Sequence, residues 1–258
     1  MFDPGIWIGA LPAMLSVALL FWLLSVKLAD VSIVDILWAP FFLLAALAYA
    51  LANPAETPRE ALVLAMVAIW SLRLAAHIAV RSHGHGEDRR YQAIRARNEP
   101  GFRWKSLYIV FALQAGLAWI ISLPLLGATL SPAPLGWLDA IGVTLWLIGF
   151  SVETVADGQL QRFRNRPDSA GKVLDTGLWR YSRHPNYFGE CLLWWGFYLI
   201  ALSAGAWWSL PGPLLMTLFL LRVSGVTLLE SDIAERRPAY REYQRRTSAF
   251  LPLPRRTS

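Results

Sequence analysis

Residues 106–138 read SLYIVFALQAGLAWIISLPLLGATLSPAPLGWL, which is 33 positions without one charged side chain. Three further uncharged runs cover residues 4–26, 36–55 and 191–221, and each is at least 20 residues long. An α-helix needs about 20 apolar residues to cross the hydrocarbon core of a bilayer. The sequence therefore predicts an all-α polytopic membrane protein, with a single membrane domain over residues 1–258.

The composition excludes several other classes of protein. Of the 258 residues 55% are hydrophobic and only 16% are charged, against about 25% charged in an ordinary soluble domain. The one cysteine, Cys191, lies in an apolar run, so we expect no disulfide framework and no cysteine metal site. The net charge of +6 comes from basic residues that lie between the apolar runs. They are placed to orient helices in a membrane, and we expect no nucleic-acid partner.

Seven transmembrane helices with short connections fit the sequence. We predict them at residues 6–27, 33–52, 60–81, 104–126, 134–161, 184–203 and 207–229. Dipeptides that contain proline fall at or near several of these ends, as in Asn53-Pro54 and Pro100-Gly101.

Lysine and arginine predict the orientation of this bundle. The connection between helices three and four holds seven of them, counting Arg81 and Lys105 at the adjoining helix ends. The connection between helices five and six holds six and the tail after helix seven holds seven, together 20 of the 24. The positive-inside rule makes that side cytoplasmic. We therefore expect the N-terminus outside and the C-terminus in the cytoplasm, in the inner membrane of a bacterium. The basic tail either lies on anionic membrane lipids or helps to close a ligand site.

Polar, charged and tryptophan residues in or next to the predicted spans recur at helical spacing. An ionisable side chain among them is costly in lipid and is a functional candidate by default. Most fall in the cytoplasmic half, which predicts a polar cavity that opens to the cytosol. The alternative is that they only pair with one another to hold helices together. By helix they are Ser32, Asp35 and Trp38; Trp70, Arg73, His77 and Arg81; Glu153, Asp157, Gln161 and Arg164; Asn186 and Glu190; and Arg222 and Glu230.

Asp35 and His77 are the candidates for proton-donating chemistry. A carboxylate near an imidazole raises its pKa and keeps a proton available near neutrality. The alternative is that Arg73 pairs with Asp35 in a structural ion pair. The run from His83 to Glu87 lacks a third well-spaced ligand, so it predicts a solvated loop and no metal site. Because the chain has no Gly-x-Gly-x-x-Gly motif and no phosphate loop, a nucleotide would bind through cytoplasmic basic residues and helix ends.

Residues 177–190 read GLWRYSRHPNYFGE and form the most specific string in the chain. This string resembles the Arg-His-Pro-Asn-Tyr-x-Gly-Glu/Asp signature of membrane steroid 5α-reductases, their bacterial relatives and the sterol reductases. The similarity extends over roughly residues 145–254 and includes the pair Tyr240 and Tyr243 in the tail. Residues 177–190 are called the signature below.

The resemblance implies a seven-helix fold that binds NADPH from the cytoplasmic side and transfers hydride to a conjugated enone of a steroid or similar lipid. Asn186 and Glu190 would hold the nicotinamide end, Asp157 and Arg164 the ribose and phosphate region, and Lys172 a phosphate. The other cofactor candidates are Glu153, Tyr181, Arg183, His184, Tyr187, Arg222 and Glu230. Residues 131–258 would then bind the cofactor, and residues 1–130 the substrate.

The N-terminal part departs from the family pattern. Family reductases use a glutamate on helix two and a tyrosine on helix three to polarise the substrate carbonyl. Here Asp35 stands about a turn from the glutamate position, and His77 lies where the tyrosine is expected. We predict that His77 donates to the carbonyl and is oriented by Asp35, with Trp38 and Arg73 beside the substrate.

A second class of enzyme shares part of this signature. Methyltransferases of the isoprenylcysteine carboxyl type carry Arg-His-Pro-x-Tyr-x-Gly and use S-adenosylmethionine. Asn186 and Glu190 favour the reductase, as does the single Glu230 where those methyltransferases often have two glutamates. A transporter or sensor would predict inverted repeats or helices broken in mid-membrane, and neither is evident in the sequence.

Overall fold

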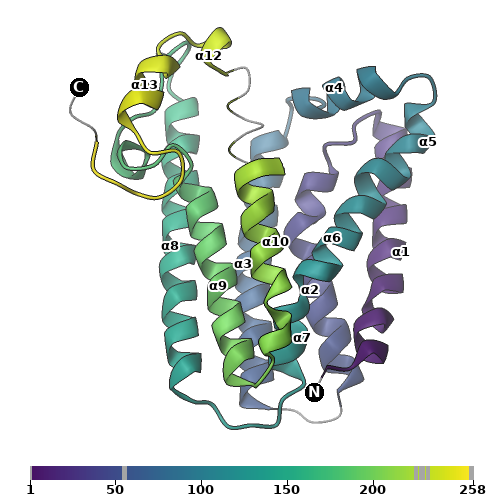
Figure 1. Ribbon diagram of the computed structural model, residues 1–258. Coiled ribbons are helices and arrows are strands. Elements are labelled where there is room, and N and C mark those ends of the chain that lie inside the picture. The colour runs from purple at the N-terminus through teal and green to yellow at the C-terminus, as the bar shows by residue number, and fades with distance from the viewer. Residues whose placement is uncertain (1, 54–56, 224–225, 227–229, 231–232, 256–258) are drawn as a thin grey trace. The chain divides into compact units, whose positions relative to one another are not determined.

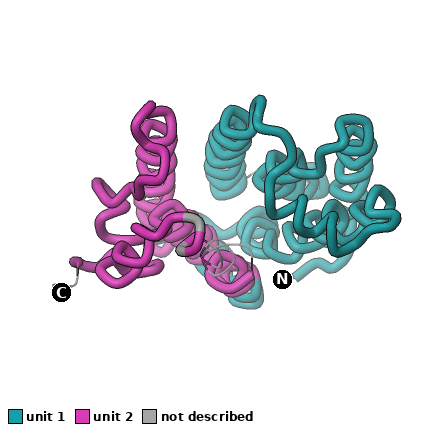
Figure 2. Tube along the Cα trace, turned by 90° about the horizontal axis from the view of Figure 1, so that it is seen from above, with its two compact units in different colours: residues 1–136, 201–211 teal, residues 137–200, 212–258 magenta. Residues whose placement is uncertain are grey.

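The computed structural model describes the chain except for residues 1, 54–56, 224–225, 227–229, 231–232 and 256–258 (Figure 1). The described residues form helices and no β-strand, with one isolated β-bridge between Ser182 and Ser248. They divide into two compact units (Figure 2). Unit 1 holds residues 1–136 and 201–211, and unit 2 holds residues 137–200 and 212–258.

Unit 1 contains three long helices and several shorter segments. They are α1 (Pro4–Leu28), α2 (Val34–Ala52), α3 (Pro58–Ser82), α4 (Arg89–Asn98), α5 (Phe102–Ser106), the π-helical η1 (Leu107–Ala112), α6 (Leu113–Ile121), α7 (Leu123–Thr129) and η3 (Trp207–Ser209). Side-chain caps fix two of the starts. Asp3 accepts from the backbone N–H of Ile6 at 3.1 Å, and Thr57 accepts from that of Glu60 at 3.1 Å. Such caps satisfy N–H groups that have no partner inside the helix.

The long helices of unit 1 have apolar side chains both in the core and on the outside. Phe42 and Tyr49 of α2 and Trp70 of α3 are fully buried. On the outside Leu20 of α1 is 63% exposed and Leu72 of α3 is 64% exposed. In a soluble protein these leucine side chains would face water, which is unfavourable. In a membrane protein they face the lipid. Five helical stretches of the described chain are long and apolar enough to cross a membrane: 4–28, 34–52, 58–82, 102–121 and 137–164.

The fourth predicted helix is not continuous. The range 104–126 divides into α5, η1, α6 and α7, with a break at Ser122 just before Leu123 and Pro124. The proline cannot donate a backbone hydrogen bond, so the preceding turn ends there. The Ser122 hydroxyl lies 2.7 Å from the Tyr49 hydroxyl of α2. The break therefore coincides with a buried polar contact between elements.

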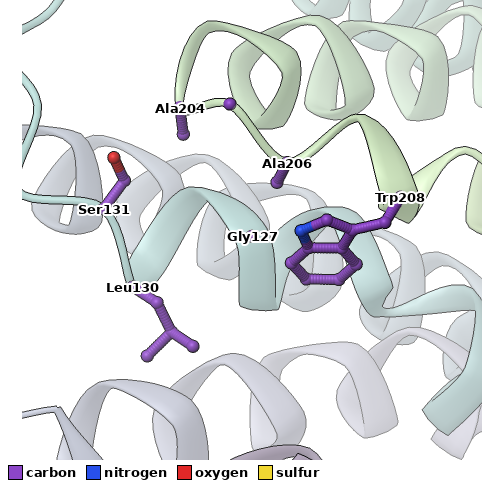
Figure 3. Close-up of a pocket in the computed structure, with 7 residues that line it drawn as sticks. Gly127, Leu130, Ser131, Ala204, Ala206 and Trp208 are labelled. Atoms are coloured by element: carbon purple, nitrogen blue, oxygen red, sulfur yellow. The ribbon is translucent and has the colours of Figure 1, made fainter. Parts of the chain in front are cut away.

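The segment 201–211 packs tightly against α7. A Cβ atom on Gly127 would overlap that of Ala206, so only glycine fits there. Beside this contact lies a cavity of about 20 Å³ lined by residues that include Ser131 and Trp208 (Figure 3). That volume is about the size needed for one water molecule, so we treat it as part of the packing.

Unit 2 is built on two long helices and a tail. Its elements are α8 (Trp137–Arg164), η2 (Gly177–Arg180), α9 (Pro185–Ser203), α10 (Pro211–Leu218), the π-helical η4 (Phe219–Val223), α12 (Ile233–Arg236) and α13 (Tyr240–Arg246). The predicted helix 207–229 is divided into η3, α10 and η4, and part of its second half lies outside the described residues. The count of seven spans and the orientation remain predictions.

Candidate functional site

The first candidate site lies in unit 2, where α8 and α9 cross at glycines. A Cβ atom on Gly189 would lie 2.6 Å from the backbone nitrogen of Glu153, and one on Gly149 would lie 2.6 Å from the carbonyl oxygen of Gly189. This close approach brings Glu153 of α8 near Glu190 of α9, and the two residues are 2% and 6% exposed. Acidic side chains are rarely so buried unless they are paired or functional.

Asn186 and Asp157 extend this polar group by one turn on each helix. The side-chain nitrogen of Asn186 donates to Oδ1 of Asp157 at 3.2 Å, and Asp157 is 6% exposed. We call Glu153, Asp157, Asn186 and Glu190 the α8–α9 cluster. It contains one amide and three carboxyl groups, a set that suits a ligand with hydroxyl and amide groups to donate. All four predicted residues lie on the two helices that cross here, and the side chains of Asn186 and Asp157 are hydrogen-bonded.

Arg183 of the signature ties it to the C-terminal tail. Nε and Nη2 donate to the two carboxylate oxygens of Glu230 at 2.6 and 2.8 Å, a bidentate pair whose side chains are 11% and 13% exposed. Nη1 donates to the carbonyl oxygens of Gln244 and Thr247 at 3.0 and 2.6 Å. The Arg183 guanidinium therefore bonds residues that follow it in the chain by between 47 and 64 positions.

Three more donors or partners surround Glu230. His184 Nε2 lies 3.0 Å from Oε1, the Tyr240 hydroxyl donates to Oε1 at 3.1 Å, and Gln244 donates to Oε2 at 3.2 Å. Burial alone would raise the pKa of Glu230, but the hydrogen bonds from His184 and Arg183 outweigh it and lower the pKa from 4.5 to about 2. We call these five residues the Glu230 network.

The remaining cofactor candidates lie at the edges of unit 2. The Tyr187 ring stacks parallel to the His184 ring with centroids 5.6 Å apart, and Tyr181 is 45% exposed. Three basic candidates have exposed side chains: Arg164, Lys172 and Arg222. Lys172 donates to Asp168 at 2.7 Å. The structure thus gathers the acids and the amide, while these basic residues stay accessible.

The second candidate site lies in unit 1 and centres on Asp35. Arg90 Nη2 donates to Oδ2 of Asp35 at 2.6 Å, and the Tyr91 hydroxyl donates to Oδ1 at 2.6 Å. Gln114 of α6 donates to the same tyrosine oxygen at 3.0 Å. Arg90 and Tyr91 belong to α4, at the opposite end of unit 1 from the N-terminus (Figure 1). We call these four residues the Asp35 network.

The charge of Asp35 shapes its two neighbours from α4. Burial, and then the Asp35 carboxylate, raise the pKa of Tyr91 well above its usual range. Burial works against the charged form of Arg90, but Asp35 and Asp88 outweigh it and raise the pKa of Arg90 above its already high value. At neutral pH the network therefore holds a protonated tyrosine hydroxyl and a charged guanidinium.

The other substrate candidates lie on α2 and α3. The Trp38 ring meets Phe42 edge to face at 5.2 Å, and Phe42 packs against Trp70 at 5.7 Å. Arg73 and His77 are half-buried on α3, one and two turns beyond Trp70. The sequence pairing of Asp35 with His77 or Arg73 stays a prediction, because the carboxylate contacts described above come from α4.

Sequence reasoning missed Tyr91, Arg90 and Gln114. It treated the charged connection after the third helix as a loop, whereas α4 forms there. One signal could have found it, since Asp88 precedes the helix and accepts from the backbone N–H of Arg90 at 2.9 Å, as a capping aspartate does. Because arginines surround Tyr91 in the sequence, the segment looks polar and gives no indication that this tyrosine is buried.

The fold and these two sites define an integral membrane protein of helices with buried polar clusters. The chain belongs to the family described as "Protein of unknown function (DUF1295)", whose profile matches residues 21–247. An uncharacterized protein of Schizosaccharomyces pombe is 26% identical over 90% of this chain and 75% of its own length. No solved structure matches the chain.

Shorter matches link the chain to reductases. It is 36% identical to the 3-oxo-5-alpha-steroid 4-dehydrogenase 1 of Mus musculus over 28% of this chain and 26% of the mouse protein. It is 30% identical to a Delta(14)-sterol reductase of Schizosaccharomyces pombe over 27% of this chain and 20% of that protein. These matches confirm the family resemblance, and they span about a quarter or less of those relatives' length.

Proposed function

We propose that the chain is an NADPH-dependent membrane reductase that acts on the conjugated C=C bond of a 3-oxo-Δ4-steroid or similar lipid enone. The observation that carries this proposal is the α8–α9 cluster, in which the signature residue Asn186 bonds Asp157 at 3.2 Å beside two buried glutamates. The similarity to a steroid dehydrogenase and a sterol reductase supports the same reaction class.

The residues of unit 2 fit such a nucleotide by their chemistry. Asn186 and Glu190 offer an amide and a carboxyl group to a carboxamide, and Asp157 offers an acceptor to ribose hydroxyls. Arg164 and Lys172 are accessible cations for phosphates. When bound, the reduced nicotinamide supplies the hydride.

The Glu230 network would act by holding the signature in place. Arg183 engages the tail through four hydrogen bonds, and His184 is fixed between Glu230 and the Tyr187 ring. A site held by packed and bonded neighbours keeps its geometry as a ligand enters. We therefore give these residues a positioning role, and Arg222 an accessible contact to the nucleotide.

On the substrate side, we propose that residues 1–130 bind the enone through Trp38 and Arg73, with His77 as the hydrogen-bond donor to its carbonyl. Asp35 is engaged by Arg90 and Tyr91, so the neutral hydroxyl that it orients is that of Tyr91. Tyr91 is thus a second candidate donor. Either donor would stabilise the negative charge that develops on the carbonyl oxygen as hydride adds to the β-carbon.

The reaction itself is the test. The full chain, purified in lipid nanodiscs, is mixed with NADPH and a 3-oxo-Δ4-steroid, and the product is analysed by mass spectrometry. We expect NADPH oxidation and a product heavier by two hydrogens, and we expect both to be lost in Asn186→Ala. Methyl transfer from S-adenosylmethionine without NADPH oxidation would establish the methyltransferase alternative instead.

A further inference from the structure

Unit 2 contains an open hollow of about 390 Å³, and Lys172 is the one residue of its lining that has a role in the function proposed above. It lies between the loop that follows α8, helix α13 and the end of the tail. That volume falls in the range of small-molecule sites. The residues that matter are Lys172 and Asp175 of the loop, Glu242, Tyr243 and Arg246 of α13, and Arg255.

The hollow has an excess of positive charge. Three cations line it against two acids. Arg246 pairs with Glu242 at 2.5 Å and Arg255 with Asp175 at 2.7 Å, while Lys172 is 59% exposed. Each guanidinium has five N–H donors, so these pairs leave donors over. Within the described part of the chain Nε of Arg255 is buried and has no hydrogen-bond partner.

Tyr243 joins the hollow to the signature. Its ring lines the hollow, and its hydroxyl donates to the carbonyl oxygens of Trp179 and of Ser182, the latter at 3.2 Å. Burial raises the pKa of Tyr243 above its usual range, so the hydroxyl stays protonated. One wall of the hollow is therefore tied to the backbone of the signature.

We propose that this hollow binds a phosphate monoester, and that Arg246 and Arg255 select the ribose 2′-phosphate that distinguishes NADPH from NADH. This inference rests on the proposed function for the identity of the nucleotide. A monoester carries about −1.5 to −2 charge at pH 7, and arginine meets phosphate with two parallel donors. The buried α8–α9 cluster, poor in cations, suits the uncharged end of such a ligand.

Binding of two adenosine phosphates tests the proposal without catalysis. The full chain in phosphatidylcholine nanodiscs is titrated with adenosine 2′,5′-bisphosphate and with adenosine 5′-monophosphate. Arg246→Ala and Arg255→Ala should each raise the Kd of the bisphosphate by about tenfold, which is the effect of losing one charge-assisted hydrogen bond. The Kd of the monophosphate should be unchanged. Arg246→Lys and Arg255→Lys, which keep the charge but lose the fork, should give smaller losses.

Arg245→Ala is the matched control. Arg245 neighbours Arg246 on α13 and is 79% exposed, and it does not line the hollow. The Arg245→Ala variant should bind both nucleotides with the same Kd as the unchanged chain. Thermal unfolding of every variant separates loss of the site from loss of the fold.

Three outcomes of the titration overturn the proposal: no bisphosphate binding by the unchanged chain, equal losses for both nucleotides in a folded variant, or abolition of binding by phosphatidylglycerol in the nanodisc. The third would assign the hollow to a lipid headgroup. Selective bisphosphate binding without enone reduction would overturn only the proposed reaction. Reduction that proceeds equally with NADPH and NADH would overturn only the present inference.

Discussion

The α8–α9 cluster and the Asp35 network are both buried polar sites, yet they are assembled differently. In the cluster, two helix backbones meet at Gly149 and Gly189, and the acids follow from helical spacing. In the network, Arg90 and Tyr91 of α4 bond Asp35, and Gln114 of α6 donates to Tyr91. The α8–α9 cluster depends on close packing, and two of its residues belong to a contiguous sequence motif. The Asp35 network depends on a short polar helix that no sequence motif predicts.

The largest expected effect comes from removing the ion pair between Arg183 and Glu230. Arg183→Ala leaves Glu230 buried without its bidentate partner, which typically costs about 3–5 kcal/mol of unfolding free energy. Thermal or denaturant unfolding of the purified chain measures the loss. Arg180→Ala is the control, because the Arg180 side chain is exposed three residues earlier. A similar stability for both variants would mean that the Glu230 network does not hold unit 2.

The next effect separates the two candidate donors of unit 1. His77→Ala should lower turnover of a competent enone by about 10²–10³, the usual effect of removing a preorganised donor. NADPH binding should be unchanged, because the variant touches only the substrate side. Tyr91→Phe is the matched comparison, since it removes one hydroxyl from the Asp35 network. If Tyr91→Phe alone gives the large loss in kcat, the role of donor passes from His77 to Tyr91.

A smaller effect tests whether close packing builds the α8–α9 cluster. Gly189→Ala places a methyl group against backbone atoms of α8, and overpacking of this kind costs about 1–3 kcal/mol. The Gly189→Ala variant should also bind NADPH more weakly, because α8 and α9 must move apart to make room for the methyl group. Gly158→Ala in the same α8 meets no atom within 4 Å, so it should be neutral or slightly stabilising. Equal stability of the two variants would remove the packing argument.

The last effect appears only at acid pH and comes from the titration of Glu230. The pKa of Glu230 is about 2 in the folded chain against its usual 4.5, so the folded form binds this proton less readily than the unfolded form. Its stabilising effect is complete above about pH 4.5 and is lost as the pH falls toward 2. Glu230→Gln should therefore flatten the decline in stability over this window. An unchanged slope would contradict the assigned pKa.

The long helices were predictable because apolar runs and end signals are local. The predicted ranges 33–52 and 184–203 lie within a residue of α2 and α9 at each end. The break at Ser122 was not predictable, since it coincides with a contact to Tyr49 on another helix. Helix α4 was missed because its arginines resemble a solvated loop until Asp35 is placed beside it.

The candidate sites divide in the same way. The family resemblance assigned Asp157 and Asn186 to different parts of one cofactor, and the structure shows that their side chains are hydrogen-bonded. The bidentate pairing of Arg183 with Glu230 could not be read from the sequence, because the two residues are 47 positions apart. Nor could Tyr91 be assigned to Asp35, because a hydrogen bond between distant segments leaves no periodic trace in the sequence.

The most direct test of the central claim is the thermal unfolding of the full chain with NADPH and, separately, with S-adenosylmethionine. A ligand at a hundred times its Kd adds about 2.7 kcal/mol to the stability of the state it binds, which for a chain of this size is roughly 5–10 °C in Tm. The account predicts that rise with NADPH and none with S-adenosylmethionine. A rise with S-adenosylmethionine alone would contradict it.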